Sequence, residues 1–484
     1  MKARDFFINV NSEISTLRRV MIHSPDNGLG KVVPSKAQDW LFEDIIDLDA
    51  MRRQEYDLYI KILLYFLDQD KVAGKIKTID SPENDRLFYK PNQPLFHNST
   101  AVVEFQQLLF EILENSDVKA QLVAAVCAYE KCTWNVQKRL LDCEAVELAR
   151  VLISGSFLNG DMIFPPVPNL IFTRDIGIVI NDHILLNRAA TLARARESLL
   201  GRYVFYNHPV FAAYHEKIIE LSESIHYFLL PEGENDFKKT TLEGGDIMMI
   251  GPRHLLIGVS ERTSSFAANQ IIKAVFSKNL VDKVTVLKIP RKRAYMHIDT
   301  IFTQVARDIW VLLGSLGRKG DHIQHEGVYE QLMESKPADQ LKIMQFSRLN
   351  EKDNREFEFL EDLLEDISKN DLQVKTPIKF VYSGGNVFPY DAREQWTDSC
   401  NLLVIKEGVA IGYDRNKKTA EAFKKAGFKI YKAGDLLDKF EKKELSPENM
   451  QKSLILLPSA ELSRARGGSH CMSLPLNRDA YIPE

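Results

Sequence analysis

The sequence predicts an α/β fold built from repeated ββα modules, with one all-helical segment inserted among them. Four stretches share one pattern, in which a polar residue starts a short apolar run, a turn follows, and a second apolar run completes the unit. Helical patterns separate these units. From Leu95 to Phe157 glycines and prolines are few, and apolar residues recur at helical spacing. A charged stretch from Ser347 to Asn370 predicts an exposed acidic helix.

The four units carry turn residues that favour hairpins between their apolar runs. They begin at Asp175, Asp246, Asp299 and Asn401. The opening LRRVMIHSP and the closing CMSLPLNR provide strands for a fifth unit that joins the two ends of the chain. Modules that surround one centre would place their strand starts around a shared cavity. Polar residues at these starts are therefore candidates for a functional site.

Length and composition are those of a folded globular protein, with 484 residues of which 45% are apolar and 27% charged. The net charge of -4 and the lack of a long lysine or arginine run argue against a nucleic-acid partner. No apolar stretch is long enough to cross a membrane, and the first residues lack a secretory signal. The five scattered cysteines favour a reducing cytoplasm over a disulfide framework.

Metal ions and nucleotide cofactors find no support in the sequence. Cys127, Cys132 and Cys143 lack a fourth ligand at zinc-finger spacing and lie in the predicted helical segment. His470 and Cys471 are adjacent, so on a strand their side chains would face opposite sides. Neither a P-loop nor a GxGxxG fingerprint is present. We therefore expect no metal and no cofactor.

Four stretches carry reactive side chains near predicted strand starts. PNLIFTRD ends in Asp175, and LEGGD places Glu243 beside two glycines, which allow a close backbone approach. In MHIDT, strand periodicity puts His297 and Asp299 on one face. RARGGSHCMS contains Cys471, which could be a core thiol, a metal ligand or a nucleophile. Taken singly, each stretch is more often structural than catalytic.

Together, and in this order, the motifs resemble those of the arginine deiminases, a family of the guanidine-modifying superfamily with the pentein fold. The matching motifs run through the whole chain and are LFEDI, PNLIFTRD, LEGGDIMMIG, GVSERTS, MHIDTIFT, SGGN, EQWTDSCN, GYDRN and RARGGSHCMS. There are two departures from the family pattern. Ser469 stands where deiminases commonly have a third glycine, and the chain is longer than is typical.

The resemblance implies a five-bladed α/β propeller of ββαβ-type modules. Residues 1–90 and 158–484 would form this catalytic propeller, and residues 91–157 would form a helical insertion domain. It also implies a cytoplasmic homo-oligomer that acts on a small molecule, L-arginine, and converts its guanidinium to citrulline and ammonia. Two alternatives stay open. One is an amidinotransferase or a hydrolase of another guanidino compound, and the other is a non-catalytic arginine-binding protein.

The resemblance also assigns roles to individual residues. Cys471 would attack the guanidinium carbon as a thiolate, and His297 would act first as an acid and then as a base. Asp175 and Asp299 would hold the guanidinium through charge-assisted hydrogen bonds, and Glu243 would be a third acidic contact, to the guanidinium or to His297. The residues expected to bind the rest of the substrate are Asn169, Phe172, Arg194, Arg262 and Arg466. Among these, Arg194 and Arg262 are expected to bind the α-carboxylate.

Overall fold

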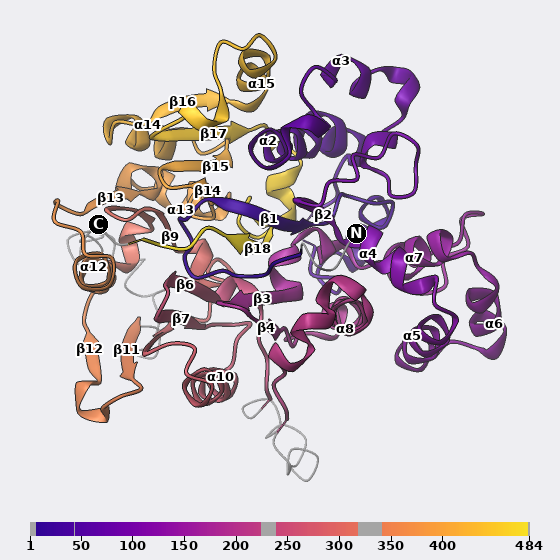
Figure 1. Cartoon of the computed structure of the whole chain (residues 1–484), viewed down its shortest axis with the longest axis horizontal. Coiled ribbons are helices and arrows are strands. Elements are labelled where there is room, and N and C mark those ends of the chain that lie inside the picture. Colours follow the sequence, from indigo (N-terminus) through magenta and orange to yellow (C-terminus); the bar gives the residue numbers. More distant parts are fainter. Residues whose placement is uncertain (1–5, 43, 224–238, 318–340, 483–484) are drawn as a thin grey trace.

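Strands and helices alternate along the chain in this computed structural model, which describes residues 6–42, 44–223, 239–317 and 341–482 (Figure 1). The described strands form five separate sheets. The class is therefore α/β, as the sequence predicts. None of the helices in these ranges is both long and apolar enough to span a membrane.

Each sheet contains the same core, an antiparallel pair of strands whose second member also pairs in parallel with a third strand. Four cores follow the order of the chain. They are β3 (Gly177–Ile180), β4 (His183–Leu186) and β5 (Ile218–Ile219); β6 (Ile247–Gly251), β7 (His254–Val259) and β8 (Lys283–Lys288); β9 (Phe302–Ala306), β10 (Ile309–Leu312) and β13 (Lys379–Tyr382); and β14 (Leu403–Lys406), β15 (Val409–Tyr413) and β17 (Ser453–Leu457). The four predicted hairpins are thereby confirmed.

The fifth sheet joins the two ends of the chain. Its β1 (Leu17–Ile22) pairs antiparallel with β18 (Leu474–Arg478) and parallel with β2 (Val102–Glu104). The predicted fifth unit is therefore present. Three strands extend other sheets, namely β11 (Lys342–Ser347) and β12 (Arg355–Phe357) beyond β8, and β16 (Lys429–Lys432) beside β17.

Helices connect the strands and cover the sheets. They are α1 (Leu48–Ala50), α2 (Asp57–Leu67), α3 (Ile76–Ile79), α8 (Ala195–Asn207), α10 (Ser265–Ser277), α12 (Leu360–Asp366), α13 (Tyr390–Trp396), α14 (Lys417–Lys425) and α15 (Ala433–Glu441). In α10 the side chains of Ala267, Ile271 and Val275 lie on one face, at helical spacing, and pack in the core formed with β6, β7 and β8. The expectation of one acidic helix over Ser347–Asn370 is wrong in its first part, where Arg355–Phe357 forms a sheet edge instead.

The predicted helical segment contains α4 (Phe105–Leu113), α5 (Ser116–Tyr129), α6 (Trp134–Asp142) and α7 (Ala145–Ser154). Its expected start at residue 91 needs correction, because Val102–Glu104 forms β2 and pairs with β1. The apolar, β-branched pair before Glu104 suits a buried strand. Figure 1 shows α5 and α6 at the rim of the molecule, away from the sheets.

Tight turns precede the first strand of every sheet core and position the candidate site residues. The turns are Thr173–Ile176 before β3, Gly244–Asp246 before β6, Ile298–Thr300 before β9, residues 397–400 before β14 and residues 469–472 before β18. These five strands each lie at an edge of their sheet. The turns carry, or directly adjoin, Asp175, Glu243, Asp299, Asn401 and Cys471.

Candidate active site

A buried cavity of about 30 Å³ lies where these turns meet. All of the predicted site residues except Asp299 line it, and Asp299 contacts the lining residue Cys471. The sequence did not single out the other lining residues, which are Leu41, Arg293, Met296, Thr300 and Ala465. The cavity is large enough for one or two water molecules and too small for an arginine molecule without rearrangement.

Cys471 lies in a turn that the glycines before it make possible. A Cβ atom on Gly467 would lie 2.3 Å from Cε1 of Phe172, and one on Gly468 would lie 2.5 Å from the Asn401 carbonyl oxygen. Only glycine tolerates both approaches. The Cys471 backbone N–H donates to Asn401 Oδ1 at 3.0 Å, and Asn401 Nδ2 donates to the Cys471 sulfur at 3.2 Å. Asn401 therefore fixes both the backbone and the thiol of Cys471.

Ser469, which departs from the family pattern, has its side chain fully satisfied. Its hydroxyl donates to the Ile411 carbonyl oxygen at 2.7 Å and accepts from the Leu403 N–H at 3.0 Å. The serine thereby ties the nucleophile turn to β14 and β15. Ser469 is buried and is not among the residues that line the cavity, so its contribution is to support the turn.

The thiol of Cys471 is held in its neutral form. Burial raises its pKa well above the ordinary value, and the negative charges of Asp299, Asp175 and Asp398 raise it further. The hydrogen bond from Asn401 acts in the opposite direction but does not outweigh them. The sulfur donates a hydrogen bond to Asp299 Oδ2 at 3.4 Å. Without an added cation, this site stabilises a thiol rather than a thiolate.

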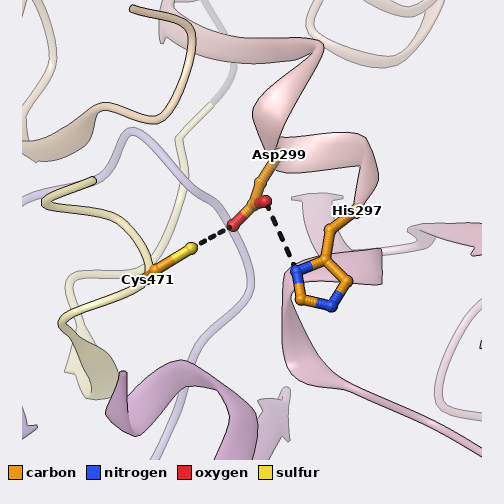
Figure 2. Close-up of side chains that lie close together, drawn as sticks. All are labelled: His297, Asp299 and Cys471. Carbon is orange, nitrogen blue, oxygen red and sulfur yellow. Dashed lines mark hydrogen bonds and ion pairs between the residues drawn. The ribbon is translucent and has the colours of Figure 1, made fainter. Parts of the chain in front are cut away.

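His297 reaches the site from an extended residue that is followed by a 3-10 turn, so the expected strand at MHIDT is wrong. The side chains of His297 and Asp299 nevertheless approach each other, with Nδ1 and Oδ1 4.0 Å apart (Figure 2). The Nε2 atom of His297 lies 3.0 Å from Glu243 Oε2. A Cβ atom on Gly245 would lie 2.4 Å from Nδ1, so the second glycine of LEGGD makes room for this ring.

The charges around His297 favour the imidazolium. Burial lowers its pKa, but Asp175, the hydrogen bond to Glu243 and the charge of Asp246 outweigh burial and raise the pKa to about 10. Burial likewise raises the pKa of Glu243, yet Arg194, His297 and Arg262 hold it well below its usual range. The site therefore pairs the imidazolium of His297, which can donate a proton, with the ionised carboxylate of Glu243.

Asp299 connects the nucleophile to the imidazole. Its carboxylate lies between the thiol of Cys471 and the ring of His297 (Figure 2). Oδ2 also accepts from His470 Nδ1 at 2.8 Å. The expectation that His470 and Cys471 face opposite sides is therefore wrong, because the two residues lie in a turn rather than a strand. Oδ1 has no hydrogen-bond donor among the described residues.

Arg194 occupies an unexpected position. Its Nη1 donates to Asp175 Oδ2 at 2.7 Å and to Glu243 Oε2 at 3.1 Å, and its Nε donates to Glu197 Oε2 at 2.9 Å. Burial alone would lower its pKa, but Glu197, Asp175 and Glu243 raise it well above the ordinary value. Two of the acids expected to hold the substrate guanidinium are thus bound to a guanidinium of the chain itself.

The remaining predicted residues surround this centre. Arg262 Nη1 lies 3.9 Å from Glu243 Oε1, and Asn169 donates through its side-chain amide to the Trp40 carbonyl oxygen at 2.8 Å. The Cζ atom of Arg466 lies 3.4 Å from the ring centroid of Trp396. This stacked guanidinium is a cation–π contact.

Within the described part of the chain, two sets of side chains have ligand atoms close enough for a metal ion. They are His297, Asp299 and Cys471, and Asp175, Glu243 and His297. A metal ligand must be a neutral imidazole, whereas the raised pKa of His297 keeps its ring protonated at neutral pH. Arg194 also donates to Asp175 Oδ2 and to Glu243 Oε2, and His297 lies against the same oxygen of Glu243. The donor set suits a guanidinium better than a metal ion.

Sequence reasoning missed several residues that shape the site. Asn401 ends the motif EQWTDSCN at the start of a predicted strand, and this position, which it shares with Asp175 and Asp299, would have predicted that it lies at the site. Asp246 closes LEGGD and accepts from the Ile298 N–H at 3.1 Å and the Ser260 hydroxyl at 2.6 Å, which orients the turn of Asp299. Glu13, which contacts His470, carries no sequence signal at all.

Curated relatives are similar to this chain over nearly its whole length. The arginine deiminase of Treponema denticola is 28% identical over 489 residues, covering 98% of each chain. That of Clostridium perfringens is 28% identical over 494 residues, covering 98% of this chain and 99% of the relative. Among solved structures, SxtG, an amidinotransferase from Microseira wollei, covers 99% of both chains at 12% identity with a TM-score of 0.45.

The family model described as arginine deiminase matches residues 149–478, well over half of the chain. The match includes all five turns that meet at the cavity, and it contains every predicted site residue. The chain belongs to the arginine deiminase family.

Proposed function

We propose that the chain hydrolyses the guanidinium of free L-arginine to L-citrulline and ammonia through a covalent amidino intermediate on Cys471. One observation carries the proposal. Asp175 and Glu243 already hold a guanidinium, that of Arg194, in the cavity that Cys471 and His297 line. Membership of the arginine deiminase family, and two curated relatives that carry this name, support the same activity.

In this proposal the substrate takes the place of Arg194. The cavity has no room for two guanidinium groups, so the Arg194 side chain leaves Asp175 and Glu243 as arginine enters. Released from these acids, Arg194 joins Arg262 in binding the α-carboxylate, for which a guanidinium offers two parallel donors. Asn169 and Phe172 line the aliphatic part of the substrate, and Arg466 adds positive charge beside the nucleophile turn.

The substrate cation activates the nucleophile. The guanidinium of arginine offsets the carboxylates that raise the pKa of Cys471, and the thiol then loses its proton to solvent water. Asp175 and Asp299 hold the guanidinium nitrogens, and the Asp299 Oδ1 atom that lacks a donor in the described residues accepts one of their N–H groups. The thiolate attacks the guanidinium carbon and forms the C–S bond.

His297 then moves the protons. As an imidazolium it donates a proton to one terminal nitrogen, which departs as ammonia and leaves the amidino group on Cys471. The neutral ring next takes a proton from water. The resulting hydroxide attacks the same carbon, the C–S bond breaks, and the hydroxyl proton passes to the departing sulfur, so that the products are L-citrulline and the Cys471 thiol.

The architecture and cellular setting are part of the same proposal. The five sheet cores with equivalent connectivity support five blades of a pentein propeller, formed by residues 1–90 and 158–484 together with β2, with the helices of Phe105–Ser154 as an inserted domain. The five free cysteines suit a reducing cytoplasm. We assign a homo-oligomer by the family resemblance. Light scattering with size exclusion measures the oligomeric state, and a monomer at all concentrations contradicts this part.

Mass spectrometry of the protein quenched during arginine turnover tests the function. We expect an arginine-derived adduct on the Cys471 peptide, together with citrulline and ammonia in equal amounts. Cys471→Ala abolishes both the adduct and turnover, whereas the matched variant Cys127→Ala, in α5, keeps them. Citrulline production by Cys471→Ala contradicts the covalent mechanism. Amidino transfer to glycine without net ammonia makes the chain an amidinotransferase, and arginine binding without turnover makes it a binding protein.

A further inference from the structure

Three buried ionisable residues, Asp299, His470 and Glu13, contact one another in a row beside the cavity, and none of them is among its lining residues. His470 Nδ1 lies 2.8 Å from Asp299 Oδ2, and His470 Nε2 lies 3.2 Å from Glu13 Oε2. The three residues are at most 4% exposed. Glu13 belongs to the segment before β1, and Arg174 Nη1 lies 3.7 Å from its Oε1. The last member of this row, Glu13, thus comes from the N-terminal segment, outside residues 149–478.

The surroundings of Glu13 and Asp299 favour the ionised form of both carboxylates. A neutral imidazole has only one N–H donor, but both ring nitrogens of His470 face carboxylate oxygens. Burial raises the pKa of Glu13, yet Arg174, His470 and Arg478 hold it at about 2. Burial also raises the pKa of Asp299, and His470 and His297 bring it below its usual range. Both carboxylates are therefore ionised, and each has an oxygen within hydrogen-bond distance of one His470 ring nitrogen.

We propose that Glu13 and His470 are positioning residues, which form a buried relay that fixes the Asp299 carboxylate against the nucleophile. With Oδ2 held by His470, the carboxylate cannot rotate, and Oδ1 stays directed at the substrate guanidinium. Glu13 orients the His470 ring through Nε2 and acts on Asp299 only through that ring. This inference rests on the proposed function, because it assigns Asp299 to the clamp for the substrate guanidinium.

Two substitutions of His470 test its two hydrogen bonds one at a time, because each substitution keeps one bond and removes the other. In His470→Asn the amide nitrogen is bonded to Cγ, as Nδ1 is, so it can still donate to Asp299 but cannot reach Glu13. In His470→Gln the amide nitrogen takes the more distant place of Nε2, so it can reach Glu13 but leaves Asp299 without its donor. Losing a hydrogen bond to a charged group costs about 10- to 100-fold in rate. We expect His470→Gln to lower kcat by about this factor, and His470→Asn to lower it clearly less.

Glu13→Gln tests the outer member by a double-mutant cycle. It removes the charge that holds His470 but keeps the shape of the side chain. We expect it to lower kcat in the wild-type background and to have no further effect in the His470→Asn background, where the link is already broken. This cycle does not depend on the folding of His470→Gln. Its readout is the split between kcat and KM, since a general loss of folded protein would change kcat in both backgrounds.

His23 provides a matched control, because its ring nitrogens each lie 3.0 Å from a carboxylate oxygen, of Asp26 and of Glu104, and it is equally buried. Neither carboxylate lines the cavity. His23→Gln is expected to lower the melting temperature without a fall in kcat of the folded fraction. Equal losses of kcat in His470→Asn and His470→Gln, or additive losses with Glu13→Gln, overturn the relay.

An activity assay of the wild-type protein tests the proposed function independently of the relay. If the wild-type chain makes no citrulline, the proposed function fails, and crystal structures of the two His470 variants decide the relay instead. The Asp299 carboxylate is expected to keep its orientation in His470→Asn and to lose it in His470→Gln. An unchanged carboxylate in both variants overturns the relay, whatever the activity.

Discussion

At Cys471, burial and the carboxylates of Asp299 and Asp175 together raise the pKa of the thiol. The same carboxylates are needed to bind a guanidinium, so the free site is a poor place for a thiolate. A cation between the acids and the sulfur removes this conflict. The resting enzyme is therefore protected from alkylation and oxidation, which require the thiolate, until a cationic substrate is bound.

Removing one of the acids should separate thiol reactivity from turnover. We expect Asp175→Asn to abolish citrulline production and yet to speed alkylation of Cys471 by iodoacetamide at pH 8. A nearby charge moves a pKa by roughly one to three units, so the expected gain is about tenfold or more. Because a raised thiol pKa keeps the neutral form to higher pH, wild-type alkylation should be slow at pH 8 and rise above pH 9. Mass spectrometry of the Cys471 peptide measures both rates.

Asp282→Asn serves as the control, since Asp282 pairs with Arg253 and Arg348 at the surface, away from the cavity. This variant should alkylate at the wild-type rate. Equal rates for wild type and Asp175→Asn at every pH would show that the carboxylates do not govern the thiol.

Residue types and spacing made the acids, His297 and Cys471 candidates, because these residues lie in motifs at predicted strand starts, and the structure brings them together at one cavity. Their assignment to a site came from the order of the motifs and the family resemblance. The state of Arg194 could not be predicted in the same way. A long flexible side chain can reach either the α-carboxylate position or the acids beside it, and only the packed structure decides between them. The role of Glu13 could not be predicted either, because Glu13 and His470 are 457 positions apart in the sequence and only the folded structure brings them into contact.

At the scale of elements, the shared feature is a tight turn that leads into the edge strand of each sheet. Hairpin periodicity and turn residues predicted the strands correctly, because alternation and turn chemistry are local properties. The turns themselves were not predicted. A 3-10 turn of three residues is too short to produce a periodic pattern in the sequence. The strand periodicity therefore wrongly includes Ile298–Thr300, which form a 3-10 turn.

Substitution of Gly245, in the turn before β6, tests whether this turn positions the His297 ring. We expect Gly245→Ala to displace the His297 ring, because the new Cβ atom would lie 2.4 Å from Nδ1. A displacement of this kind costs about 100-fold in kcat. The matched variant Gly251→Ala, at the other end of β6, meets no atom closer than 3.7 Å and should keep wild-type kcat. Steady-state kinetics and melting curves distinguish a displaced ring from a destabilised fold.

Similar activity of the two alanine variants would contradict this assignment of Gly245. So would a fall in kcat that simply follows a lower melting temperature. Helix α5 contacts the segment that leads to Arg194, because the Tyr129 hydroxyl donates to the Leu192 carbonyl oxygen at 2.7 Å, two residues before Arg194.

For the whole molecule, the two ends of the chain meet in one sheet. The Asn9 N–H donates to the Leu476 carbonyl oxygen at 2.9 Å, and the Arg478 N–H donates to the Asn9 carbonyl oxygen at 2.9 Å. The sheet of β18, β1 and β2 holds the nucleophile turn at one end and Glu13 just before β1. The site is therefore complete only when the first and last segments of the chain are paired.

A circular permutation tests this closure. Joining the two ends through a flexible linker and opening the chain between Lys131 and Cys132, in the connection of α5 to α6, leaves every sheet intact. We expect this permutant to unfold in one cooperative transition and to retain most of the citrulline production. Opening the β3–β4 hairpin at Asn181 instead breaks the two backbone hydrogen bonds between Asn181 and Val10 and loosens the strand that follows Asp175, so activity should be lost. Equal activity of both permutants, measured with calorimetry beside the assay, would contradict the view that the converging sheets build the site.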